Sequence, residues 1–139
     1  MNSTGPPTAD SEEVNIRIAR IYRRVDGILC VHTKEDVEVT LEDSIQSYEA
    51  VVKMAAGKKA LLLEFSGKGG IIQDKARDYW VAKRKDNPVI AEAIVAKSLA
   101  HKIMVNFLIR FLDAGREIKL FTKEEDAVKW LNTFRNKLD

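Results

Sequence analysis

The sequence predicts a single α/β domain with a mixed, mostly parallel sheet, an N-terminal hairpin and about four helices. The first reason is the order of periodicities: a β-hairpin is followed by helix and strand in strict alternation, which favours right-handed crossovers and parallel strand pairing. The second reason is size. A chain of 139 residues with 45% hydrophobic residues fits one domain with one substantial core.

The hairpin comes first along the chain. Residues 14–24 are rich in β-branched side chains, with apolar residues at about every second position. The alternation slips near Ile18 and Ala19, which indicates a β-bulge. Asp26-Gly27 is a typical hairpin turn, and residues 28–33 supply the returning strand.

Two capping patterns mark the starts of helices. Thr40 and Asp43 form a capping box before an apolar stripe that ends at Gly57, and Thr122 and Glu125 form the same box before the last helix. Between these helices the sequence predicts strands at 60–65, 91–97 and 116–121 and helices at 73–85 and 98–113.

Composition limits the partners. Lys and Arg number 23 against 21 acidic residues, a net charge of +2, which argues against nucleic acid and anionic membranes as partners. No run approaches the ~20 apolar residues that a membrane span requires. Residues 1–12 are polar and are expected to form a disordered leader before the domain at 13–139. Because Cys30 is the single cysteine, we expect no intramolecular disulfide and a cytoplasmic location.

Two segments resemble a known family. ALLLEFSG (60–67) is similar to the strand of the STAS and SpoIIAA-like family that ends in Leu-Asp-Leu-Ser-Gly, and REIKLFTKEEDAVKWL (116–131) is similar to its closing strand and helix. The order of elements over 14–138 also looks like this family, closest to its uncharacterised bacterial branch, whose fold CRAL-TRIO lipid carriers share in outline. The resemblance implies a SpoIIAA-like fold and a protein-interaction role.

One activity of that family is not supported. Its anti-sigma-factor antagonists carry a phosphorylated serine at the start of the helix after this strand. The corresponding residues here are Ile72-Gln73-Asp74-Lys75, which offer no hydroxyl group. A phosphoserine switch at this position is therefore not expected.

The glycine-rich loop is the first candidate site. Ser66, Gly67, Lys68, Gly69 and Gly70 lie between a strand and a helix, where backbone N–H groups can hold an anion. The loop matches neither the P-loop spacing nor the dinucleotide-binding spacing. A plain connecting turn is the structural alternative and the one we favour.

Three other residues carry chemistry. Cys30 and His32 share one face of a strand, but a metal site needs three or four ligands, so a core cysteine and a half-buried histidine are expected. Glu64 follows three leucines in the central strand. It lies either at the exposed C-terminal end of the strand, which we favour, or against a basic group.

The predicted helix 99–113 has an unusually broad apolar surface. Val105 and Ile109 lie away from the Phe107 side, so a helix packed only on its own sheet would leave them exposed. The helix faces a deep core, a dimer partner or an apolar cavity. Val105 and Ile109 are the candidates for a homodimer interface.

Aromatic and basic residues are mixed on the helix at 73–85. Tyr79 and Trp80 precede Lys83, Arg84 and Lys85, a combination that also occurs in nucleic-acid-binding patches. Because the net charge is small, we favour aromatic rings that fold inward from a solvated helix face.

These observations favour a non-enzymatic binding or protein-interaction module that forms a homodimer. The alternative is a carrier of a small apolar or lipid-like ligand, and a phospho-regulated anti-sigma-factor antagonist is less favoured. No acid–base pair, metal-ligand set or nucleophile can be assembled from the sequence, so neither an enzyme nor a cofactor is expected.

Overall fold

The computed structural model describes residues 13–99, 102, 103, 105, 106, 109 and 116–139. Its centre is a six-stranded sheet with the order β1-β2-β3-β5-β7-β8. The strands of this sheet are β1 (Glu13–Asn15), β2 (Ala19–Arg23), β3 (Leu29–Thr33), β5 (Ala60–Phe65), β7 (Val89–Val95) and β8 (Glu117–Phe121). The helices are α1 (Leu41–Ala55), α2 (Asp74–Lys83) and α4 (Glu124–Asn132), followed by a 3₁₀ turn at Arg135–Lys137.

The sheet is mixed and mostly parallel, as predicted. β1, β2 and β3 pair antiparallel, whereas β3, β5, β7 and β8 pair parallel. Each parallel connection carries helical chain, because two parallel neighbours cannot be joined by a tight turn. The predicted α/β architecture is confirmed.

The bulge predicted near Ile18 is wrong. β1 ends at Asn15, and the chain reverses so that Val14 pairs with Ile21. Backbone hydrogen bonds between Ile16 and Ala19 close this turn. A slip in the apolar alternation occurs at a β-bulge and at a turn between two strands alike. Here it marks the turn of a second hairpin, between β1 and β2. The Asp26-Gly27 hairpin is confirmed, with Gly27 at φ 89°.

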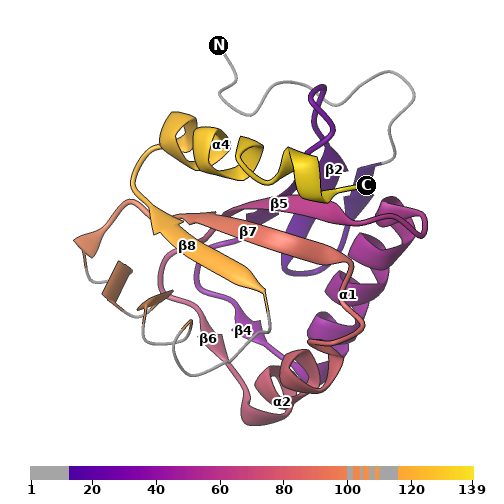
Figure 1. The fold of residues 1–139 in the computed structure, drawn as a ribbon. Helices are drawn as coiled ribbons and strands as arrows, with labels where there is room; N and C mark the ends of the chain where they lie inside the picture. The colour runs from indigo at the N-terminus through magenta and orange to yellow at the C-terminus, as the bar shows by residue number, and fades with distance from the viewer. Residues whose placement is uncertain (1–12, 100–101, 104, 107–108, 110–115) are drawn as a thin grey trace.

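Helices cover the two faces of the sheet differently (Figure 1). α4 lies across one face, where Ala127 and Leu131 are fully buried against Tyr22 and Leu63. α1 and α2 lie on the other face, with a small parallel pair formed by β4 (Glu38–Val39) and β6 (Ile71–Ile72). The sequence analysis did not predict this pair, because two-residue strands are too short to show a period.

The first capping box is confirmed and the second is wrong. The Thr40 hydroxyl accepts from the backbone of Asp43, and the Asp43 carboxylate accepts from the backbone of Thr40. α4 begins at Glu124 with Lys123 as its N-cap, and no side chain caps it. Glu124 instead accepts a hydrogen bond from Arg24 at 3.2 Å, and the negative charges of the first turn favour the helix dipole.

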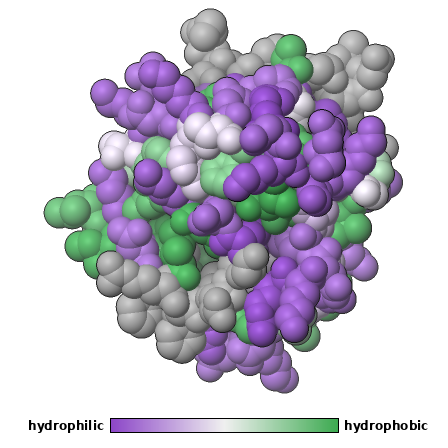
Figure 2. Space-filling model, in the orientation of Figure 1, coloured by the Kyte–Doolittle hydropathy of each residue, from purple (hydrophilic) through white to green (hydrophobic). Residues whose placement is uncertain are grey.

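Two predicted segments lie largely or wholly outside the described residues. The leader at 1–12 is wholly outside them. In the predicted helix at 98–113, the described residues 99, 102, 103, 105, 106 and 109 are helical. On the face of the molecule in Figure 2, hydrophilic surface predominates and hydrophobic surface lies near the centre and the left edge.

Candidate functional site

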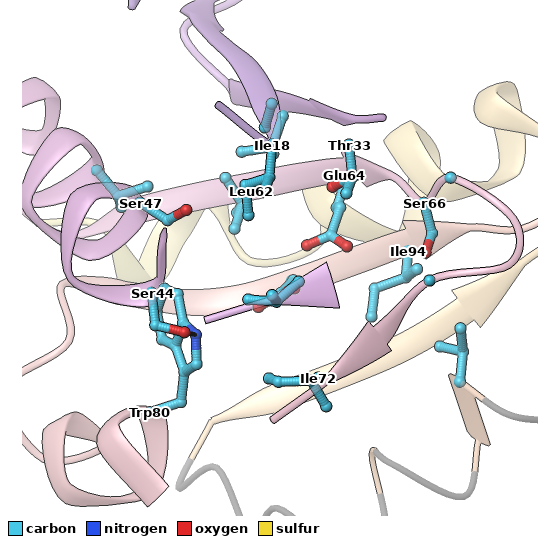
Figure 3. A pocket seen from close by; sticks show the side chains of 18 of the residues that line it. Ile18, Thr33, Ser44, Ser47, Leu62, Glu64, Ser66, Ile72, Trp80 and Ile94 are labelled. Atoms are coloured by element: carbon cyan, nitrogen blue, oxygen red, sulfur yellow. Dashed lines mark hydrogen bonds between the residues drawn. The ribbon is translucent and has the colours of Figure 1, made fainter. Parts of the chain in front are cut away.

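A cavity of about 420 Å³ lies between the sheet and the layer formed by α1, α2, β4 and β6. Figure 3 shows side chains from the sheet, from both helices and from β6 converging on it. Most of the wall is apolar, including Ile18 from the turn before β2, Leu62 from β5 and Ile94 from β7. Its volume falls within the range of about 300–1,000 Å³ that is typical of small-molecule sites.

Two glutamates reach this cavity from neighbouring strands. Side chains alternate along a strand, and Leu62 pairs with Glu92 while Glu64 pairs with Ile94. Glu64 and Glu92 therefore lie on the same face of the sheet, one step apart along the strands. Arg116, immediately before β8, donates a hydrogen bond from its Nη2 to Glu92 Oε1 at 2.7 Å. The side chains of Glu92 and Arg116 are 8% and 11% exposed.

The surroundings of Glu64 favour its protonated form. Burial, the negative charge of Glu92 and a hydrogen bond with Glu92 together raise the pKa of the Glu64 carboxyl group to about 8, and Arg116 opposes the change. Glu64 borders the cavity, as Figure 3 shows, and its side chain is therefore partly accessible. Protein atoms nevertheless surround its carboxyl group. Two carboxyl groups and one shared proton thus lie together at the cavity, with the Arg116 guanidinium hydrogen-bonded to Glu92.

The favoured interpretation of Glu64 as an exposed strand end is wrong, and the basic-group alternative is closer. Its immediate partner is a second carboxyl group, Glu92, and the base lies one step further, at Arg116. Sequence reasoning missed Glu92 and Arg116. The available signal was a glutamate inside each of two predicted apolar strands. Glu64 and Glu92 therefore form a pair of neighbouring carboxyl groups that was not expected from the sequence.

The helical wall is held by aromatic contacts. The indole Nε1 of Trp80 on α2 donates to Ser44 Oγ on α1 at 3.1 Å. Tyr48 meets the rings of Tyr79 and Trp80 edge-to-face, with centroids 5.9 and 5.8 Å away. The ammonium of Lys83 lies over the Tyr48 ring at 5.6 Å. The aromatic residues of α2 therefore fold inward, as predicted.

The glycine-rich loop packs closely on the segment after β3. A Cβ atom at Gly67 would overlap the carbonyl oxygen of Lys34, and Gly69 has φ 76° with the Asp36 carboxylate where its side chain would be. The amide of Asp36 donates to the Lys68 carbonyl at 2.8 Å. Close backbone approach thus accounts for these glycines. Anion binding by residues 66–70 stays a prediction. The Asp36 carboxylate lies beside the loop, and its negative charge opposes an anion there.

The described part of the apolar helix faces the cavity with Val105 and Ile109. Val105 is 6% exposed in the single chain, and both residues line the cavity. Leu99 and Ile103 are 73% and 63% exposed. The exposure on which Val105 and Ile109 were chosen as dimer-interface candidates is therefore not observed. The dimer itself stays a prediction.

Cys30 and His32 share one face of the sheet, as predicted, and this face is opposite the cavity. Cys30 is fully buried, and burial raises the pKa of its thiol to about 11. His32 is half-buried and stacks between Tyr22 and Phe65, with centroids 5.7 and 4.6 Å away. Burial, followed by the charge of Arg20, lowers the pKa of its imidazole.

A second hollow of about 980 Å³ lies near the carboxyl ends of β3, β5 and β7 and the start of α4. Basic residues including Lys68, Lys97 and Lys123 line it together with the acidic residues Glu35 and Glu124. Ser66 and Gly67 line both hollows, so the loop forms part of the wall between them. Charges of both signs give this hollow no clear ligand preference.

Two searches of the described residues were negative. Among them, no three His, Cys, Asp or Glu side chains come together as a possible metal site. No helix in the same part of the chain is long and apolar enough to cross a bilayer.

Comparison with known sequence families identifies the domain. The profile of a family described as "Domain of unknown function (DUF7793)" matches residues 21–135. The chain belongs to this family. In this DUF7793 member, the matched range contains Glu64, Glu92 and Arg116 together with all three α-helices named above. No curated protein matches the chain.

A solved structure has a similar fold. It is the crystal structure of an uncharacterized protein from the DUF3478 family with a SpoIIAA-like fold, from Shewanella loihica PV-4. The two chains share 18% sequence identity, the TM-score is 0.59, and the alignment covers 91% of this chain and 99% of that chain. The DUF7793 member therefore has the SpoIIAA-like fold that the sequence resemblance implied.

Proposed function

We propose that this protein binds a small, largely apolar molecule in the cavity between the sheet and helices α1 and α2, without catalysing a reaction. The observation that carries this proposal is the hollow of about 420 Å³ beside the apolar cluster that the sheet forms with α1. The hollow opens partly to solvent, so a small molecule has a way into it. Its size and its largely apolar wall are those of a typical small-molecule site.

The wall supports the same proposal. Strands supply apolar side chains such as Val31 and Leu62, and Val51 on α1 faces them. A few polar groups interrupt this surface, which is the usual design of a small-molecule site. Among the alternatives drawn from the sequence, the carrier of a small apolar ligand fits this cavity best.

Titration with 1-octanol, followed by backbone amide shifts, tests the proposal. We expect shifts concentrated at Val31, Leu62 and Ile94. Ser47→Leu adds apolar volume at the cavity wall and should weaken 1-octanol binding, whereas Gln46→Leu on the exposed side of α1 should not. Native mass spectrometry of the freshly purified protein would report a co-purified ligand. Absence of any localised shift with 1-octanol would contradict the proposal.

A homodimer is a second proposal, with a different interface from the one first expected. Leu99 and Ile103 are exposed and lie one helical turn apart, so they form an apolar surface on the outer side of the segment. A twofold axis would bury this surface on both subunits. A cytoplasmic location also remains part of the proposal, on the basis of the single cysteine.

A further inference from the structure

We propose that the ligand of this cavity is an amine, with an apolar body and one protonated amino group bound by Glu64 and Glu92. This inference rests on the proposed function, because it assigns chemistry to the polar end of a ligand in the same cavity. The geometry that supports it is the placement of two carboxyl groups on one face of adjacent strands, with a single guanidinium group beside them.

The charges inside the cavity are not matched by the protein alone. Arg116 donates to Glu92, which accounts for one carboxylate. The other described basic residues of the wall lie at its margin. Lys34 is exposed to solvent. The Arg77 guanidinium forms ion pairs with two carboxylates, with Nη1 3.4 Å from Asp74 Oδ1 and Nη2 3.7 Å from Asp78 Oδ1. Glu64 is therefore the carboxyl group that these bases do not compensate.

In the protein without a ligand, a proton on Glu64 supplies the positive charge that the bases do not. The high pKa of Glu64, about 8, reflects the cost of placing a second buried negative charge next to Glu92. An ammonium group in the cavity would supply the same positive charge and would release the proton. It could donate hydrogen bonds to both carboxylates, which lie on one face of the sheet.

Other headgroups fit less well. A ligand carboxylate would add a third negative charge beside Glu64 and Glu92, and the nearest guanidinium is already bonded to Glu92. A hydroxyl group can accept or donate a hydrogen bond but leaves the charge balance unchanged. The apolar walls formed by Leu62, Ile94 and Val51 require that the rest of the ligand be hydrocarbon.

Three matched probes test the headgroup: n-octylamine, 1-octanol and nonanoate, which share one octyl chain. Calorimetric titrations of the full chain should give n-octylamine an affinity at least about tenfold above that of the other two probes, as expected for a charge-assisted contact. Near pH 7, binding of the amine should release about one proton, measured from the heat in two buffers of different ionisation enthalpy. The amine affinity should rise about tenfold per pH unit from about pH 6 to 8.

Glu64→Gln keeps the size and hydrogen-bonding capacity of the protonated side chain but cannot ionise. The variant should retain 1-octanol binding and lose the amine preference and the pH dependence. Glu117→Gln removes an exposed carboxylate from β8 and should change neither. The proton-release measurement uses the unchanged protein, so it decides the question even if Glu64→Gln does not fold.

The outcomes separate the two proposals. If 1-octanol binds as well as n-octylamine, or the amine binds without proton release, the amine inference is wrong and the cavity function stands. If Glu64→Gln keeps the amine preference, another group binds the ammonium and the inference is also wrong. If no probe binds, the proposed function itself fails.

Discussion

The indole of Trp80 donates a hydrogen bond to the hydroxyl oxygen of Ser44, with Nε1 and Oγ 3.1 Å apart. This contact joins α2 to α1 at the wall of the cavity, and Ser44 is fully buried. The edge-to-face contact of Trp80 with Tyr48 reinforces the same junction. The two helices that precede and follow the central strand β5 in sequence are thus held in the position that leaves the cavity open.

Replacing Ser44 with alanine should lower the free energy of unfolding by ~1–3 kcal/mol, because the Trp80 N–H loses its acceptor in a partly buried place. Urea denaturation followed by circular dichroism measures the loss. Ser47→Ala makes the same chemical change one turn further along α1 and should cost less. Equal losses in the two variants would mean that the hydrogen bond does not stabilise the junction.

Asp43 should make the fold sensitive to acid. Hydrogen bonds from Arg17 and Thr40, opposed by burial, together lower the pKa of Asp43 from 3.8 to about 2, and Arg17 makes the largest contribution. Because the folded-state pKa lies below the unfolded value, the stabilisation is present above pH 3.8 and is lost as the pH falls through about 2.

The measurement is the unfolding free energy of the protein and of Asp43→Asn between about pH 5 and pH 2. The difference between the two should narrow as the pH falls. Asp78→Asn is the control, since it makes the same chemical change at an exposed position on α2. A constant difference across the range would show that Asp43 contributes no proton-linked stability.

Gly67→Ala should destabilise the protein by ~1–3 kcal/mol, because the new methyl group overlaps the Lys34 carbonyl oxygen and the loop must move. Thermal melts give the change in stability. Lys68→Ala is the control, because its backbone carbonyl can still accept from Asp36. A phosphate titration checks the anion prediction separately. If the amides of Gly67, Gly69 and Gly70 do not shift, phosphate does not bind at the loop.

Val105→Lys should destabilise the fold by at least ~2 kcal/mol, because it places an ammonium group at a buried position in the cavity wall. Leu99→Lys, at a position that is 73% exposed, should leave the single chain stable. Sedimentation of the Leu99 variant then tests the outer apolar surface. If the protein is dimeric and Leu99→Lys remains a dimer, the interface lies elsewhere. A stable Val105 variant would contradict the inward orientation.

Local patterns in the sequence were sufficient for most elements of the fold. The run at 60–65 is β5 with the same bounds, and the Thr40–Asp43 box starts α1 where predicted. Such signals work because strand alternation and helix capping involve residues only two to four positions apart. The predictions of a bulge near Ile18 and of a Thr122–Glu125 capping box are wrong because such short patterns do not show which other segment the chain will contact. The β1–β2 hairpin pairs residues such as Val14 and Ile21, which lie beyond the reach of an alternation pattern, and Glu124 contacts Arg24 from a distant part of the chain.

The candidate site was decided by the tertiary structure. The sequence could indicate Glu64 as an unusual residue in an apolar strand, but its partner depends on which strand lies beside β5 and in which register. Parallel pairing of β5 with β7 places Glu92 on the same face, and the β7–β8 pairing brings Arg116 to it.

The sequence by itself determined the α/β class, the order of the elements and the charge balance of this DUF7793 member, because each follows from composition or from short-range periodicity. The cavity, the shared proton and the inward orientation of Val105 arise only when strands and helices from the whole chain pack together. A hollow depends on how distant side chains fit, and the pKa of a buried carboxyl group depends on which charges the fold places around it.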